Sequence, residues 1–186
     1  FTNFARSLPS VRATASAEQE YAVVVTHLAK AQSISSDAVD TSVDLVAGGS
    51  ANEGDVFEIE GVGITIEAGE TLSSLRSKIN TAALDMPEGS RVNASIVNGH
   101  LALTREDTGA ASIALADTTG TVLQNLGVLD AGQAIKNVNV AGQDAQFTVN
   151  GIPVTRSTNT KLDDVVEGLT INLKGVGTAT LDIHPD

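Results

Sequence analysis

The chain has 186 residues, of which 41% are hydrophobic and 18% charged, and its 23 acidic and 11 basic side chains give a formal net charge of −12. Such an acidic chain lacks the cationic surface that binds nucleic-acid phosphates or anionic lipid headgroups, so we expect neither nucleic acid nor a membrane as a partner. Cysteine is absent, which excludes disulfides, thiolate nucleophiles and cysteine-ligated metals.

The N-terminal part of the chain contains one clear strand pattern and one group of carboxylates. The chain begins at Phe1 without an initiator Met or a secretion-signal pattern, and we interpret it as a piece of a longer protein. Tyr21–Thr26 has the composition of a strand. Asp37, Asp40 and Asp44 then follow at spacings of three and four, which would place three carboxylates on one helix face as a hard-cation site. The glycine and fixed loop of an EF-hand are missing, so we expect a solvated acidic surface instead.

Two short stretches of small, flexible residues divide the chain. They are Ala47–Asn52 and Asp130–Gln133, and both have the composition of linkers. The strand at Tyr21–Thr26 has no partner nearby in sequence. We therefore expect two small domains, one inserted into the other: a discontinuous outer domain of residues 1–46 plus 133–186, and an inserted domain of residues 47–132.

A repeat is visible at an offset of 90 residues. The sequence around Phe57 is FEIEGVGIT, and the sequence around Phe147 is FTVNGIPVT. Each copy has alternating apolar residues, a turn containing glycine, and a second alternating run, which predicts a β-hairpin. The turns are Glu60-Gly61 and Asn150-Gly151, of which Asn-Gly is the stronger turn signal because both residues tolerate positive φ.

Three segments have helical patterns. Thr71–Leu84 has apolar residues at helical spacing behind Thr71, which we expect to be the N-cap. In the second repeat copy the matching segment, Lys161–Glu167, predicts a shorter helix that ends at Gly168. Thr121–Leu126 predicts a third, short helix.

Strand patterns account for most of the remaining chain. Asn98-Gly99 joins the strand segments Val92–Val97 and Leu101–Thr104 as another hairpin. We therefore predict a mainly β fold with a few short helices (α+β), in which each domain contains a related β-hairpin–helix unit. The further strand segments are Val92–Val97, Leu101–Thr104, Ile113–Ala116, Val138–Val140, Leu169–Leu173 and Ala179–Ile183.

No pattern in the sequence assembles an active site. Asp107-Thr108-Gly109-Ala110 matches the D-T-G-A string of aspartic proteases, but no second D-[ST]-G exists to supply the paired carboxylate, so we interpret it as an Asp-led turn. His27, His100 and His184 lack the spacing of a zinc site, and we expect surface positions for them, with His100 facing solvent. We assign no catalytic, cofactor-binding or metal residues, and we predict that the protein is not an enzyme.

Longer motifs resemble one known family. The segments Gly142–Gly151 (GQDAQFTVNG), Val154–Asn159 (VTRSTN) and Glu167–Leu173 (EGLTINL) resemble flagellar filament-capping proteins, the hook-associated protein 2 family, whose pattern is A-x-F-x-[VI]-N-G, then R-S-x-N, then G-[LV]-T-[IL]-x-L. Tyr21–Gln32 (YAVVVTHLAKAQ) is similar to the family's Y-x-[VI]-x-V-x-x-L-A-x-A-Q. Further segments resemble the family's middle domain: Ile79-Asn80, Ala94–Ile96, Leu101–Thr104 and Thr108–Ala110. The resemblance implies that the D-T-G string is a turn found in the family.

The resemblance implies a position and a role. It makes the chain the central D2-D3 part of a structural, homo-oligomeric cap, secreted by the flagellar export system, that sits outside the cell at the tip of the bacterial flagellum. There it would retain exported flagellin and promote its polymerisation, with other copies of itself, flagellin, hook-filament junction proteins and host glycans as partners. The family's flanking helices, which oligomerise, do not occur in this chain, and at net charge −12 we expect the isolated chain to be monomeric.

There are three alternatives: a binding module, a related structural protein and a hydrolase. A surface adhesin for glycans would need an exposed aromatic cluster for stacking on sugars, and the chain has only five aromatic residues. A flagellin or hook-junction fragment would share the I-N motif at Ile79-Asn80, but the block Arg156–Asn159 argues against it. A hydrolase would depend on Asp107 alone.

Overall fold

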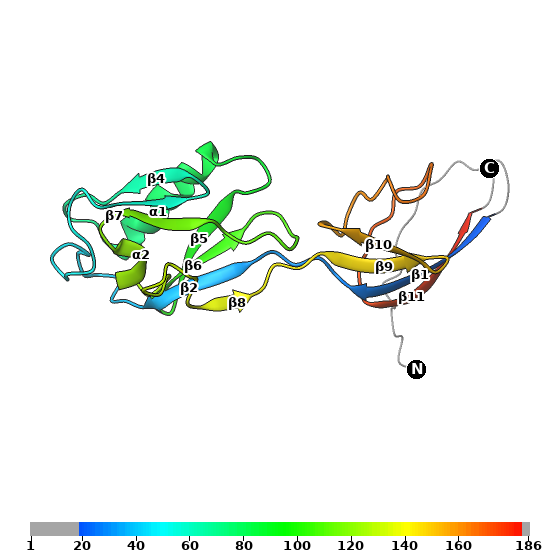
Figure 1. Ribbon diagram of the computed structural model, residues 1–186, viewed down its shortest axis with the longest axis horizontal. Helices are drawn as coiled ribbons and strands as arrows, with labels where there is room; N and C mark the ends of the chain where they lie inside the picture. The colour runs from blue at the N-terminus through cyan, green and yellow to red at the C-terminus, as the bar shows by residue number, and fades with distance from the viewer. Residues whose placement is uncertain (1–18, 184–186) are drawn as a thin grey trace. The chain divides into compact units, whose positions relative to one another are not determined.

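The structure is a computed structural model that describes residues 19–183, and the chain divides into two compact units (Figure 1). Unit 1 takes the chain up to Lys30, Thr108–Ala110 and the chain from Gly142 onward, and unit 2 takes Ala31–Asp107 and Ala111–Ala141. Strands dominate both units, which confirms the predicted mainly β class. Among residues 19–183, no helix is long and apolar enough to cross a membrane.

The unit boundaries differ from the predicted linkers. Unit 2 extends from Ala31 to Ala141, beyond the 47–132 expected for the inserted domain, because two strands outside that range belong to its sheet. These are β2 (Ser33–Ala38) and β8 (Val138–Val140), which pair with each other. The sequence pattern predicts no strand at Ser33–Ala38, since four polar residues out of six conceal the alternation that buries Ile34 and Ser36.

Unit 1 is built on one antiparallel sheet in the order β10-β9-β1-β11. The strands are β1 (Gln19–His27), β9 (Ala145–Val149), β10 (Ile152–Arg156) and β11 (Gly177–Ile183). Alternate residues of these strands pack with apolar residues of the segment 162–173 to form the core of the unit. That core comprises Val23, Val25, Ala29, Ala145, Phe147, Val149, Leu162, Ile171, Leu173 and Leu181.

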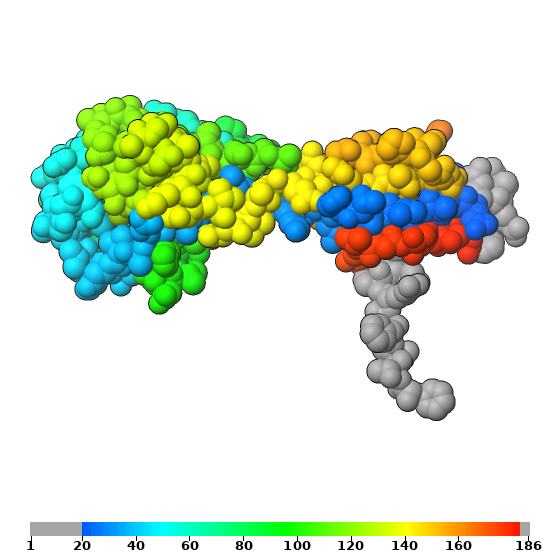
Figure 2. Space-filling view, turned by 60° about the horizontal axis from the view of Figure 1, so that its bottom comes forward, coloured from blue at the N-terminus to red at the C-terminus, as the bar shows by residue number. Residues whose placement is uncertain are grey.

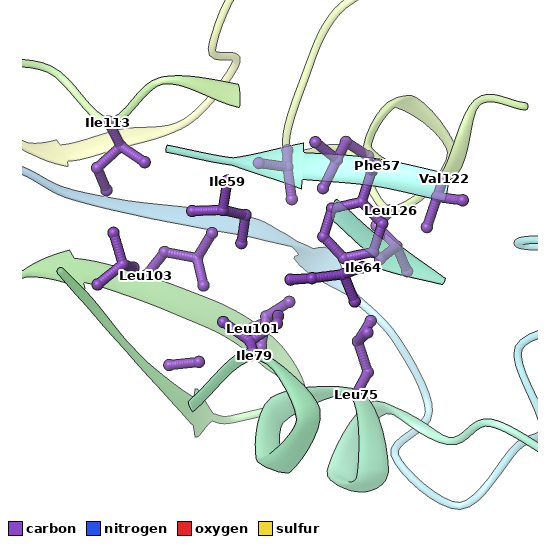
Figure 3. Packing of buried hydrophobic residues seen from close by; sticks show 14 of the residues in the cluster. Phe57, Ile59, Ile64, Leu75, Ile79, Leu101, Leu103, Ile113, Val122 and Leu126 are labelled. Carbon is purple, nitrogen blue, oxygen red and sulfur yellow. The ribbon is translucent and has the colours of Figure 1, made fainter. Parts of the chain in front are cut away.

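Unit 2 combines two sheets with a helix. The first sheet has the order β5-β6-β2-β8 and the second the order β4-β3-β7. Figure 3 shows their apolar side chains meeting those of the helix in a shared core, where Phe57, Leu75 and Leu101 are fully buried. The remaining elements are β3 (Val56–Ile59), β4 (Val62–Thr65), α1 (Leu72–Ala82), the 3₁₀-helix η1 (Ala83–Asp85), β5 (Val92–Val97), β6 (His100–Arg105), β7 (Leu115–Thr119) and α2 (Val122–Asn125).

The three predicted hairpins form, with positive φ at both turn residues. Those φ values are 51° and 78° at Glu60-Gly61, 48° and 79° at Asn98-Gly99, and 50° and 82° at Asn150-Gly151, as type I′ turns require. Phe57 pairs with Ile64 in β3–β4, and Phe147 pairs with Val154 in β9–β10. The two repeat copies therefore share the hairpin and its register.

The copies diverge after the hairpin. In the first, α1 begins behind Thr71, whose Oγ1 accepts a hydrogen bond from Ser74 N at 3.2 Å, while Ser74 Oγ accepts one from Thr71 N at 2.9 Å. This confirms the predicted N-cap.

In the second copy the helix predicted at Lys161–Glu167 does not form. Lys161 has φ of 55°, and the backbone N–H and C=O of Leu162 instead bond those of Ile171 at 3.0 and 2.8 Å. The same pairing corrects the strand predicted at Leu169–Leu173, which forms only this single bridge. A segment whose backbone groups are committed to a distant partner cannot make helical bonds.

Candidate functional site

The asparagine of the R-S-x-N block holds the backbone of another segment. Asn159 Oδ1 accepts a hydrogen bond from Ala29 N at 2.8 Å, and Asn159 Nδ2 donates one to Ala29 O at 2.9 Å. The planar amide thus satisfies both polar groups of one peptide position, as a neighbouring strand would. This joins the end of the Y-x-V-x-V segment to the C-terminal half of unit 1.

The asparagine of the I-N motif does the same in unit 2. Asn80, on α1, accepts from Ala94 N through Oδ1 at 2.7 Å and donates from Nδ2 to Ala94 O at 2.9 Å. Ala94 lies in β5, which is a border strand of its sheet. The amide therefore occupies part of an otherwise open strand edge and attaches the helix to the sheet.

Asn150, in the turn of the β9–β10 hairpin, also bonds to the backbone of a distant segment. Asn150 Oδ1 accepts from Ala22 N at 2.8 Å, and Asn150 N donates to Ala22 O at 2.8 Å. The β9–β10 turn is thereby attached to β1. In all three motifs the asparagine bonds to backbone groups of the protein itself, and the sequence does not reveal this because the partners are distant along the chain.

Arg156 of the same block closes the loop that follows it. Its Nε donates to both carboxylate oxygens of Asp164, at 3.2 and 3.0 Å, and its Nη2 lies 3.0 Å from Asp164 Oδ2. These hydrogen bonds hold the pKa of the Asp164 carboxyl below its ordinary value. The charged pair is a structural link at the surface of unit 1.

The D-T-G-A string forms a turn that joins three backbone segments of unit 1. Thr108 Oγ1 donates to Ser157 O at 2.6 Å, Gly109 N donates to Lys30 O at 3.1 Å, and Ala110 N donates to Asp144 Oδ1 at 2.8 Å. Gly109 has φ of 124°, and a Cβ there would lie 3.0 Å from the Cβ of Ser157, so the position requires glycine.

The three carboxylates that could have shared a helix face go to separate partners. Asp37, in β2, bonds Lys136 Nζ at 2.5 Å and Asn137 Nδ2 at 3.1 Å, and the hydrogen bond from Lys136 lowers its pKa. Asp40 accepts from Ser42 N at 2.9 Å and Asp44 from Val46 N at 2.8 Å, both within turns. Across residues 19–183, no three His, Asp or Glu side chains gather in a group suited to a metal ion.

The described histidines and aromatic residues differ in burial and do not form a common site. His27 ends β1 and is exposed, whereas His100 is half-buried with Nδ1 2.7 Å from Ser36 O, so the expectation that it faces solvent was wrong. His100 pairs with Ala38 across the β6–β2 ladder, which brings its ring alongside β2. Phe57 and Phe147 are buried and Tyr21 is half-buried. His184, Phe1 and Phe4 lie outside the described residues.

Known proteins are similar to this chain in sequence and in fold. The sequence model described as "Flagellar hook-associated protein 2 C-terminus" matches residues 142–186. Flagellar hook-associated protein 2 of Escherichia coli O157:H7 is 33% identical over 159 residues, which covers 77% of this chain and 32% of that protein. The chain thus spans about a third of the length of this curated relative.

Solved structures match the chain over nearly its whole length. The D2-D3 domains of the flagellar cap protein FliD from Escherichia coli align with a TM-score of 0.73 at 29% identity, covering 96% of this chain and 98% of that one. Those from Serratia marcescens align with a TM-score of 0.74 at 28% identity, covering 94% and 99%. The asparagines of the family motifs bond to distant backbone segments and so help to hold this fold together. The chain belongs to the flagellar hook-associated protein 2 family and matches its D2 and D3 domains.

Proposed function

We propose that the chain is part of a structural cap at the distal end of a bacterial flagellar filament, where the whole protein retains exported flagellin and promotes its polymerisation. The observation that carries this proposal is the match to FliD D2-D3 domains over 94–96% of this chain and 98–99% of theirs. Unit 1 then corresponds to the outer, discontinuous domain and unit 2 to the inserted one.

The partners that follow are proteins. They are other copies of the chain in the cap, flagellin and the hook-filament junction proteins, all outside the cell after export. The absence of cysteine suits passage through an export channel in an unfolded state, since no disulfide forms on the way. The motif side chains Asn80, Asn150 and Asn159 bond to backbone groups, which supports a structural rather than an enzymatic role.

Deletion of the gene tests the cap role directly. We expect most flagellin to appear in the culture medium as soluble monomer, and filaments to return when the wild-type gene is restored. Filaments of normal length and number in the deletion strain would refute the role.

A matched variant separates the cap role from a hydrolase. Asp107 is exposed in the turn that precedes Thr108, so Asp107→Asn removes the carboxylate of the D-T-G string while leaving the core unchanged. We expect this variant to restore filaments as well as the wild-type gene does. Failure to restore them, with the variant present at wild-type levels in the medium, would indicate that the carboxylate has a chemical role.

A further inference from the structure

Two hairpin turns of the chain contain the same tripeptide, Val-Asn-Gly, at residues 97–99 and 149–151. The first joins β5 to β6 and the second joins β9 to β10, and each has positive φ at both the asparagine and the glycine. An asparagine followed by glycine readily loses its side-chain amide, because glycine has no Cβ to keep its backbone nitrogen away from the asparagine side chain. The two turns offer the same local chemistry, so a difference between them comes from the tertiary structure.

The reaction begins with an attack by the glycine nitrogen on the asparagine side chain. In the first turn Gly99 N bonds to Cγ of Asn98, and the side-chain nitrogen leaves as ammonia with the proton of the Gly99 N–H. Water then opens the five-membered imide. Cleavage of the new N–Cγ bond gives aspartate in a normal backbone, whereas cleavage of the original peptide bond gives isoaspartate. One water is consumed and one ammonia released, and the reaction needs no oxidant or reductant.

The side chain of Asn98 is unrestrained within the described chain. Asn98 is exposed, and its amide makes no hydrogen bond to any of residues 19–183. The tip of the β5–β6 hairpin lies at the surface of unit 2 (Figure 2, green), where Val97 is 62% exposed. Val39 N donates to Gly99 O at 2.9 Å. This bond holds the glycine by its carbonyl oxygen and leaves its nitrogen available for the attack.

Asn150 is held by β1 instead. Its Oδ1 accepts from Ala22 N at 2.8 Å, and its backbone N donates to Ala22 O at 2.8 Å. The attack requires the side chain to rotate until Cγ comes within about 3.5 Å of Gly151 N. That rotation breaks the bond to Ala22 N, and opening of the turn breaks the second bond. Loss of both bonds makes the reactive arrangement about tenfold rarer than in the first turn.

We propose that Asn98 is a site of spontaneous deamidation in the folded protein, and that Asn150, in the same tripeptide, is protected by its bonds to Ala22. Conversion adds a negative charge to unit 2, whose 15 acidic and 5 basic residues give a net charge of −10. The remaining 8 acidic and 6 basic residues give unit 1 a net charge of −2. Isoaspartate also lengthens the backbone of the β5–β6 turn and displaces Gly99 O from Val39 N.

The folded and unfolded chain together provide the test. The 186-residue chain is incubated in mildly alkaline buffer below its melting temperature, and peptide mapping by mass spectrometry follows both asparagines in one sample. In the folded chain Asn98 should convert about tenfold faster than Asn150. In concentrated urea the two should convert at similar rates, because the tripeptides are identical. Isoaspartate among the products identifies the imide route.

Two matched variants assign the signals. Asn98→Gly removes the reacting amide and keeps a residue that tolerates positive φ, so it should abolish conversion in unit 2 and leave the slow conversion of Asn150 unchanged. Asn150→Gly should leave the conversion of Asn98 at its wild-type rate.

Three results would overturn the proposal. They are equal rates at Asn98 and Asn150 in the folded chain, an Asn98 that reacts only in urea, and a tenfold difference that persists in urea. The last result would assign the difference to local sequence rather than to Ala22. The proposal does not depend on the filament-cap role, so failure of one leaves the other intact.

Discussion

The two units share a hairpin motif but differ sharply in how they use polar residues. Unit 2 has a net charge of −10, and several of its carboxylates accept backbone hydrogen bonds: Asp44 from Val46 and Asp130 from Gly132 within turns, and Asp117, in β7, from Leu123 in α2. In unit 1, with a net charge of −2, the amides of Asn150 and Asn159 attach segments that are distant in sequence. The acidity of the chain therefore reflects the loops of unit 2, and it does not describe unit 1.

The equivalent phenylalanines of the two hairpins test whether the units are independent. Phe57 and Phe147 are 0% and 2% exposed, each within the core of its own unit. We expect Phe57→Ala and Phe147→Ala each to destabilise only their own unit, by about 3–5 kcal/mol, because a large buried side chain leaves a cavity. Hydrogen exchange resolved along the chain measures this. Equal loss of protection in both units from either variant would show that they unfold together.

The buried ion pair of unit 2 should contribute much more to stability than the exposed ion pair of unit 1. Arg105 in unit 2 is 8% exposed, bonds Glu60 at 2.7 Å and donates to Gly89 O at 2.7 Å, whereas Arg156 in unit 1 is 35% exposed. Arg105→Met should cost about 3–5 kcal/mol because Glu60 keeps a buried charge without its partner. Arg156→Met should change stability little, because solvent screens the exposed pair. Chemical denaturation of both variants makes the comparison, and equal losses would contradict it.

The side-chain amides of Asn80 and Asn159, which each bond both backbone groups of an alanine, should contribute similarly to the stability of their own units. Asn80→Ala and Asn159→Ala each leave one backbone N–H and one C=O without their partner. We expect each variant to lose about 1–3 kcal/mol, with the loss confined to the unit that contains it. Thermal unfolding gives the size, and local hydrogen exchange at Ala94 or Ala29 gives the location. Unchanged exchange at these alanines would mean that the amides are dispensable.

The smallest expected effect is a pH dependence in unit 2. Burial alone raises the pKa of Glu70, but hydrogen bonds from Lys78 and Ser74 outweigh it and hold the pKa below its ordinary value of 4.5. A lowered pKa in the folded state adds stability above pH 4.5 that is lost as the pH falls through the folded-state value. Glu70→Gln should therefore flatten the acid limb of the unfolding profile of unit 2. An unchanged profile would assign that limb to other carboxylates.

Local sequence predicted the elements whose chemistry is local. Glycine preceded by Asn or Glu specified three hairpin turns, and Thr71 with the apolar spacing behind it specified α1. The short α2 and the strand β8 also lie within their predicted ranges. The strand predicted at Ile113–Ala116 instead occupies Leu115–Thr119, since β7 takes its register from Ile59↔Leu115 on β3.

Long-range pairing decided the rest. Ser33–Ala38 is a strand because β6 and β8 flank it, and this moves the start of unit 2 to Ala31. The segment from Lys161 onward is not a helix because Ile171 takes the backbone groups of Leu162. Likewise Asn80 and Asn159 were visible as motif letters, but their function depends on where Ala94 and Ala29 lie in space.

The sequence by itself determined the mainly β class, the hairpin repeat, the capped helix and the family, because turns, caps and motif spacing are properties of neighbouring residues. The tertiary structure alone decided the unit boundaries and the use of the asparagines to hold backbone groups of distant segments. These depend on which backbone groups find partners far along the chain, and only folding brings those partners together.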